Sequence, residues 1–113
     1  MPTNITITSP IPEGGTKNDT GKPRLAFIPS NAIFGIGQAF EYGSKKYADW
    51  NYKKGLSATR LSSALLRHLF QWLGGEDLDK ESGLSHLYHA GACICMLIDA
   101  VERIPALDDR YKK

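Results

Sequence analysis

Residues 61–75 read LSSALLRHLFQWLGG, and this stretch decides the fold. Its large apolar side chains recur at helical spacing, and two glycines that favour helix termination follow at once. We therefore predict a helix that is capped by Ser57 or Thr59 and that ends at Gly74 and Gly75. Because its apolar side chains lie on nearly all sides of the axis, we expect this helix to be central in the fold. Those side chains belong to Leu61, Leu65, Leu66, Leu69, Phe70, Trp72 and Leu73.

Helical spacing continues on both sides of this stretch. Upstream, Ser30 is a favourable N-cap, and the apolar pattern from Ile33 to Tyr47 predicts a helix from about Asn31 to Lys46. Downstream, a third helix is predicted from about Ser85 to Arg103, and Pro105 ends it. No alternation typical of strands stands out. The predicted fold class is therefore all-α, with three main helices per chain.

The chain has 113 residues, which is enough for one domain. We expect residues 1–20 to form a flexible or extended arm, either free or partly tied down by a partner subunit. Residues 21–107 should form the helical domain, and residues 108–113 a charged tail that frays. Three helices bury limited surface, and a helix that is apolar all round needs neighbours. We therefore expect a homo-oligomer, a dimer or a tetramer, to complete a helical bundle.

Charge and composition exclude several classes of protein. The formal net charge of +2 is too small for nucleic-acid binding by bulk electrostatics, so no nucleic-acid partner is expected. No apolar run is long enough to cross a membrane, and no signal peptide stands at the N-terminus, so we expect no membrane partner. Cys93 and Cys95 point to different faces of a helix and cannot bridge, which favours a reducing, cytoplasmic location.

Two polar residues stand in the middle of the most apolar helix. Arg67 and His68 follow Leu66 directly, and a buried arginine is costly unless it is paired. One interpretation is structural, with Arg67 paired to a carboxylate and His68 satisfied in the core. The other is functional, with Arg67 meeting a phosphate and His68 a metal ion or an acid–base step. The spacing alone leaves both open.

An acidic loop follows this helix, and a pair of histidines follows the loop. The loop resembles the start of a calcium-binding loop, but Gly83 comes one place late and Tyr88 stands where the closing glutamate belongs. His86 and His89 are three apart and share one helix face. An antiparallel hairpin would bring the acids and all three histidines to one end. Carboxylates there suit Mg²⁺ or Mn²⁺, and imidazoles admit Zn²⁺, Co²⁺ or Ni²⁺.

Several motifs occur in an order that resembles a known family. They are DTGKPR at 19–24, YGSKKY at 42–47, LLRHL at 65–69, GEDLDKESG at 75–83 and HLYHA at 86–90. This series closely resembles the phage-type dATP/dGTP diphosphohydrolase family, a MazG-like branch of the all-α NTP pyrophosphatases. The resemblance runs from about Asp19 to Asp99. It implies helical oligomers, a divalent metal ion, and cleavage between the α- and β-phosphates.

The chain departs from better-known MazG proteins at the metal site. Those proteins carry a Glu-Glu-x-x-Glu motif on one helix, whereas the corresponding helix here offers Arg67, His68 and Gln71. Those proteins carry a second motif, Glu-x-x-Asp, on the next helix, and the pair His86 and His89 occupies a comparable place here. We therefore infer that the loop acids and these histidines supply the metal ligands. The predicted ligands are Glu76, Asp79, Glu81, His86 and His89.

The hypothesis that follows is hydrolysis of purine dNTPs, dGTP or dATP or both, to dNMP and pyrophosphate. Catalysis is assigned to His68 and to a carboxylate that activates water, among Glu41, Glu76 and Asp77. Trp50 or Tyr52 would stack on the purine. Asn51 would read its edge. The cations expected to contact phosphates are Lys22, Arg24, Lys45, Lys46 and Arg67.

Two rival hypotheses belong to other classes. In the first, the chain is a non-catalytic helical adaptor that is stabilised by a metal ion, and chelation would unfold it. In the second, it is a small DNA-binding helical protein, which the low net charge and the acidic loop disfavour.

Overall fold

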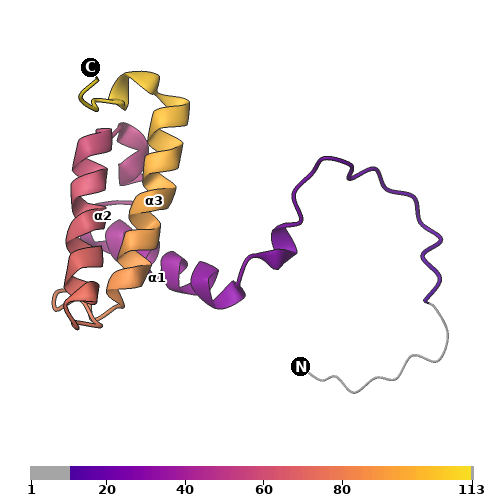
Figure 1. Ribbon diagram of the computed structural model, residues 1–113, viewed down its shortest axis with the longest axis horizontal. Coiled ribbons are helices and arrows are strands. Elements are labelled where there is room, and N and C mark those ends of the chain that lie inside the picture. The colour runs from indigo at the N-terminus through magenta and orange to yellow at the C-terminus, as the bar shows by residue number, and fades with distance from the viewer. Residues whose placement is uncertain (1–10, 113) are drawn as a thin grey trace.

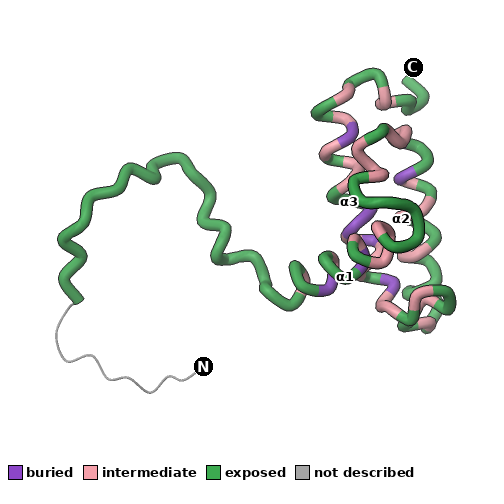
Figure 2. The backbone as a smooth tube through the Cα atoms, turned by 180° about the vertical axis from the view of Figure 1, so that it is seen from behind, coloured by how far each residue is buried: buried purple, intermediate pink, exposed green. Residues whose placement is uncertain are grey.

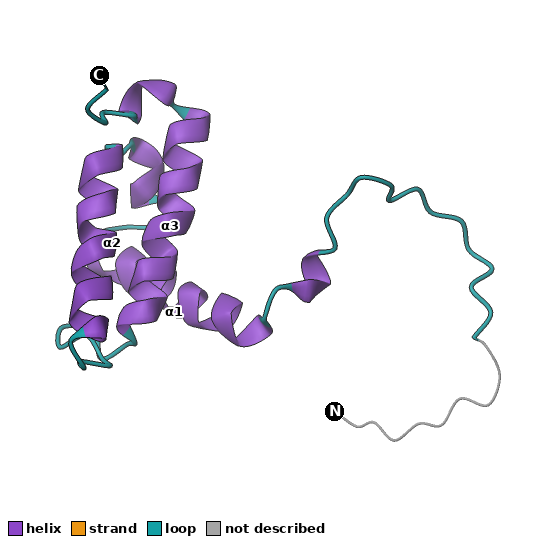
Figure 3. Ribbon diagram, viewed as in Figure 1, coloured by secondary structure: helices purple, strands orange, loops and turns teal. Residues whose placement is uncertain are grey.

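A computed structural model describes residues 11–112 of the chain. Three α-helices and three short 3₁₀-helices form there, and these described residues contain no strand (Figure 3). The prediction of an all-α fold with three main helices is confirmed. The α-helices are α1 (Ser30–Lys46), α2 (Ala58–Leu73) and α3 (His86–Arg103). The 3₁₀-helices are η1 (Leu25–Phe27), η2 (Asn51–Lys54) and η3 (Pro105–Leu107).

Helices α2 and α3 lie side by side and run in opposite directions, and α1 crosses close to the end where the hairpin loop lies (Figure 1). Helix α3 packs against both others, so α3 is central and the expectation for α2 was wrong. Small residues explain this placement. A Cβ on Gly91 of α3 would lie 2.6 Å from Cγ1 of Ile36 on α1. A Cβ on Gly35 of α1 would overlap the ring of Tyr88. A side chain at either glycine would have to displace Tyr88 or Ile36, so the two glycines allow the close crossing of α1 and α3.

The core of the single chain is small, and its buried residues lie where the helices face one another (Figure 2). Apart from Leu61, the buried apolar residues are alanines and Cys93. Large side chains of α2 remain open to solvent instead, with Phe70 63% and Leu73 64% exposed. Apolar periodicity had predicted burial on every side, but a single chain covers only the side that faces α3. Assembly into a homo-oligomer stays a prediction.

The start of α2 is held by the tail of the chain. Ser57 precedes the helix, as predicted, but its side chain makes no capping hydrogen bond. Asp109 takes that place, because its carboxylate accepts hydrogen bonds from the Thr59 backbone N–H at 2.8 Å and the Thr59 hydroxyl at 2.5 Å. The tail, expected to fray, is therefore anchored. At α1, Ser30 is the first helical residue and does not serve as the N-cap.

The segment before α1 runs away from the three helices (Figure 1). Residues 11–20 are exposed and contain no helix, while residues 1–10 of the predicted arm lie outside the described part. The flexibility of the arm stays a prediction. Within the described residues, no helix combines the length and apolar character needed to span a membrane.

Candidate functional site

The acidic loop between α2 and α3 folds into a tight turn. Leu78 and Ser85 form an isolated antiparallel bridge, and the Asp79 N–H donates to the Leu84 carbonyl at 2.8 Å. Gly83 closes the turn with a φ of 76°, a left-handed conformation that glycine adopts without a steric penalty. Because the chain doubles back here, Asp79 is half-buried while Asp77 stays exposed.

Three histidines meet beneath this turn. His68 comes from α2, and His86 and His89 come from the first turn of α3. The Nδ1 atoms of His68 and His86 lie 2.9 Å apart, and the rings of His68 and His89 stack with centroids 4.7 Å apart. His86 exposes none of its surface. Together with Glu76 and Asp79, these residues form what we call the histidine cluster.

Glu76 fixes the orientation of the His86 ring. Its Oε2 atom lies 2.7 Å from Nε2 of His86. An ionised carboxylate can only accept a hydrogen bond, so Nε2 donates to Glu76 and Nδ1 is the ring nitrogen that faces His68.

Asp79 and His89 form the other side of the cluster. Oδ2 of Asp79 accepts the Ser82 N–H at 2.8 Å and lies 3.9 Å from Nε2 of His89. Burial raises the pKa of Asp79, but hydrogen bonds from Ser82 outweigh it and hold the pKa below its usual value. Burial lowers the pKa of His68 and of His89, which favours the neutral form of both rings.

The donor atoms of the histidine cluster fit one metal ion. His68, Asp79 and His86 each offer a ligand atom, and these three atoms lie within 4.8 Å of one another. Ligands of a tetrahedral ion with bonds of about 2.1 Å lie about 3.4 Å apart, so modest side-chain rotation would close the set. The residues present could therefore hold a divalent ion.

Helix α1 braces the loop through Glu81. Its carboxylate accepts hydrogen bonds from the Tyr42 hydroxyl and from Nζ of Lys46, the latter at 2.6 Å. The bonds from Lys46 and Tyr42 lower the pKa of Glu81. The ring of Tyr42 also meets His89 edge-on, with centroids 5.9 Å apart. Glu81, predicted as a metal ligand, is thus engaged with α1, and Lys46, predicted to contact phosphates, is engaged with Glu81.

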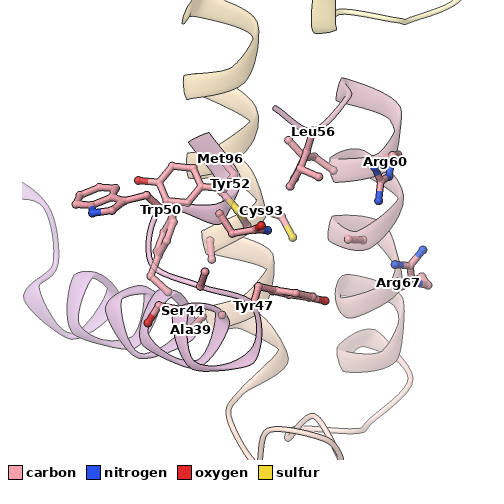
Figure 4. A pocket seen from close by; sticks show the side chains of 17 residues that line it. Ala39, Ser44, Tyr47, Trp50, Tyr52, Leu56, Arg60, Arg67, Cys93 and Met96 are labelled. Carbon is pink, nitrogen blue, oxygen red and sulfur yellow. The ribbon is translucent and has the colours of Figure 1, made fainter. Parts of the chain in front are cut away.

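A cavity of about 400 Å³ lies between the helices and η2. In Figure 4, Trp50 and Tyr52 stand on one side, Arg60 and Arg67 of α2 stand on the other, and Cys93 and Met96 of α3 lie between them. We call this the aromatic cavity. Its lining residues are Ala39, Phe40, Gly43, Ser44, Tyr47, Ala48, Trp50, Asn51, Tyr52, Leu56, Arg60, Leu61, Ala64, Arg67, Ala92, Cys93 and Met96.

Arg67 joins this cavity to the histidine cluster. It also lines a second, more open hollow of about 490 Å³, together with His68, Phe70, Gln71 and Asp79. A ligand that fills the aromatic cavity and extends past Arg67 would therefore reach His68 and Asp79. Three predicted substrate-binding residues, Trp50, Asn51 and Arg67, line the cavity.

Other predicted site residues lie elsewhere. Lys22 and Arg24 precede α1, on the segment that leads away from the helices (Figure 1). The Arg24 guanidinium covers the ring of Phe27 there. The side chains of Glu41, Lys45 and Asp77 are exposed, and within residues 11–112 no hydrogen bond or ion pair of these side chains reaches the histidine cluster, although the Asp77 backbone carbonyl accepts the His86 N–H at 3.0 Å. Their predicted roles remain untested.

Three residues near the site received no role from the sequence. Ser82 lies with Oγ 2.6 Å from Nε2 of His89, Tyr42 binds Glu81, and Arg60 lines the aromatic cavity. Arg60 could have been found, since it is seven residues before Arg67 and shares its helix face. The partners of Ser82 and Tyr42 depend on the shape of the loop.

Comparison with known proteins places the chain in a family. The family described as dATP/dGTP diphosphohydrolase, N-terminal, matches residues 12–110. A dATP/dGTP diphosphohydrolase of Salmonella phage PMBT28 is 31% identical over 96 residues, which make up 85% of this chain and 33% of that protein. The chain thus spans about a third of the length of this curated relative. No solved structure matches the chain. The resemblance seen in the motifs is confirmed: the chain belongs to the phage-type dATP/dGTP diphosphohydrolase family and matches its N-terminal region.

Proposed function

We propose that the chain binds purine deoxynucleoside triphosphates, dGTP or dATP, and hydrolyses them to dNMP and pyrophosphate. The observation that carries this proposal is the position of Arg67, which borders both the aromatic cavity and the hollow beside His68 and Asp79. The name of the phage relative supports the reaction and the substrates.

The aromatic cavity would hold the purine and its sugar. Its volume of about 400 Å³ falls in the usual range for small-molecule sites. Tyr47, Trp50 and Tyr52 offer π-faces on which a base can stack. Asn51 adds an amide with both donor and acceptor groups, which can pair with the edge of a purine.

The triphosphate would leave the cavity past the two arginines. Arg60 and Arg67 stand about two turns apart on one face of α2. Each guanidinium can donate two parallel hydrogen bonds to phosphate oxygens, a geometry that lysine lacks. This path places the reacting phosphate near His68 and Asp79.

A divalent ion would be held by His68, Asp79 and His86. When bound, it would neutralise phosphate charge and polarise the α-phosphate for attack. Among the three carboxylates predicted to activate water, Glu76 alone lies in the histidine cluster. Its Oε2 binds His86, while Oε1, which lies 3.8 Å from Nζ of the exposed Lys80, would take the proton of the attacking water. The water oxygen bonds to the α-phosphorus, the bond to the bridging oxygen breaks, and pyrophosphate leaves.

The test is product analysis of the purified chain with each dNTP, in Mg²⁺, Mn²⁺, Co²⁺ or Zn²⁺, by ion-exchange chromatography. Monophosphate and pyrophosphate from dGTP or dATP, lost in Arg67→Ala and kept in the matched control Arg110→Ala, support the proposal. A folded chain that turns over no dNTP with any of these ions refutes it. Chelation that unfolds the chain, without turnover, would instead favour the metal-stabilised adaptor.

A further inference from the structure

The candidate metal ligands contain more nitrogen than oxygen. Two imidazoles, from His68 and His86, stand with one carboxylate, from Asp79, and their donor atoms lie within 4.8 Å of one another. Mg²⁺ favours sites of oxygen ligands and keeps several of its waters, whereas imidazole suits later transition-metal ions such as Fe²⁺, Ni²⁺, Cu²⁺ and Zn²⁺. Two nitrogen ligands and one oxygen ligand therefore favour a transition-metal ion over Mg²⁺.

His86 carries a feature that is common around histidine metal ligands. Its Nε2 donates to Glu76 at 2.7 Å, and the ring is wholly buried. Ligating histidines almost always donate their second ring N–H to a carboxylate, carbonyl or water, which fixes the tautomer and the ring orientation. This hydrogen bond is independent of the distances among the three donor atoms.

The contact between His68 and His86 also brings two candidate ligand atoms together. Their Nδ1 atoms are 2.9 Å apart, the distance of a hydrogen bond in which one ring donates its N–H to the other. Because Nε2 of His86 donates to Glu76, the His68 ring is the donor in this contact, and a metal ion bound by both Nδ1 atoms would take the place of that proton.

We propose that the histidine cluster selects a transition-metal ion over Mg²⁺, and that Glu76 is a positioning residue that enforces this choice through His86. The inference rests on the proposed function in one respect: the selected ion is taken to be the ion that contacts the triphosphate. Glu76 acts on the affinity for the metal ion by fixing the orientation of the His86 ring, so that Nδ1 is aimed at His68.

The experiment is isothermal titration of the chelator-treated full chain with MgCl₂, MnCl₂, CoCl₂ and ZnCl₂ in the absence of nucleotide. The chain would carry no affinity tag, and exposed Cys95 would be replaced by serine to remove an unrelated thiol. We expect one-to-one binding, with Zn²⁺ and Co²⁺ at least about 100-fold tighter than Mg²⁺, following the usual order for imidazole-containing sites. Visible absorption of bound Co²⁺ gives a second readout of nitrogen ligation.

Variants separate the ligands from the positioning residue. His68→Asn and His86→Ala should abolish Co²⁺ binding, and Glu76→Gln should weaken it about 10–100-fold. Glu102→Gln is the matched control, since it makes the same change on an exposed residue at the other end of α3. Circular dichroism checks folding, and His68→Asn keeps the test decisive where His86→Ala fails to fold.

Equal affinity for Mg²⁺ and Zn²⁺, or unchanged Co²⁺ binding in His68→Asn, would overturn the proposal that the histidine cluster selects a transition-metal ion. Unchanged binding in Glu76→Gln overturns the role of Glu76. Because nucleotide is absent, selective metal binding without any turnover of dNTPs would refute the proposed function and leave this inference standing.

Discussion

Nδ1 of His68 and Nδ1 of His86 face each other across the α2–α3 hairpin at 2.9 Å. The two residues are 18 positions apart in the chain, so the contact exists only when the hairpin is closed. His86 is also tied to Glu76, which makes it the member on which the arrangement depends most.

Replacement of His86 should therefore destabilise the fold more than replacement of His68. His86→Ala removes a wholly buried ring and leaves Glu76 and His68 without their partner, at a cost of about 1–3 kcal/mol. His68 is half-buried, so His68→Ala should cost less. Urea denaturation followed by circular dichroism measures both, and an equal or smaller loss in His86→Ala would contradict the account.

Trp50 has a backbone conformation that should make its replacement by glycine more favourable than its replacement by alanine. It has a φ of 62°, a left-handed conformation that costs a residue with a Cβ about 1–2 kcal/mol, whereas glycine loses about 0.5–1 kcal/mol in chain entropy. Trp50→Gly should accordingly be more stable than Trp50→Ala, by up to about 1 kcal/mol in urea denaturation.

Both Trp50 variants should lose affinity for dGTP. Stacking of a base on an aromatic side chain contributes about 1–3 kcal/mol, so we expect at least about a tenfold rise in the dissociation constant. Fluorescence titration or calorimetry measures this. If dGTP binds both variants as tightly as it binds the unmodified chain, the base does not stack on Trp50.

Arg67 should matter for turnover by its geometry as well as its charge. Arg67→Ala removes charge-assisted hydrogen bonds of about 1.5–3 kcal/mol, so kcat/KM for dGTP should fall about 10–100-fold. Arg67→Lys should recover only part of this, because its ammonium is a point charge. Full recovery in the lysine variant would show that charge alone suffices.

The hydrogen bonds between Asp109 and Thr59 should make the stability of the fold depend on pH. Hydrogen bonds from the side chain and backbone of Thr59 lower the pKa of Asp109 below its unfolded value. A carboxyl with a lowered folded pKa stabilises the fold above its unfolded pKa of about 3.9, and that contribution disappears as the pH falls through the folded pKa.

Asp109→Ala should therefore melt at a lower temperature than the unmodified chain at pH 7, and the difference should shrink below about pH 4. Asp49→Ala, at an exposed turn residue, is the matched control. A difference in melting temperature that is constant from pH 7 to pH 3 would show that the Asp109 carboxylate does not hold the tail.

The sequence predicted the three helices well because their ends carry strong local signals. Gly74 and Gly75 follow α2, and Pro105 follows the end of α3. Which helix is central was not predictable from periodicity, since it depends on close approach at Gly35 and Gly91. An apolar stripe shows that a face needs a partner and does not show where the partner is.

The candidate site was predictable in its composition and less so in its detail. The histidines, Glu76 and Asp79 were expected to meet, because a hairpin brings the ends of two helices together. Glu81 binds Tyr42 and Lys46 of α1 because the loop turns at Gly83. The sequence alone could not distinguish Glu81 from the acidic residues that lie in the histidine cluster. The aromatic cavity depends likewise on the left-handed backbone at Trp50.

The most direct test of the central claim is a crystal structure of the chain with a divalent ion and a dGTP analogue whose α,β-bridge is an imido group. The account predicts the purine in the aromatic cavity, the phosphates beside Arg67, and the ion on His68, Asp79 and His86. A purine bound outside that cavity, or an ion held by other residues, would contradict it.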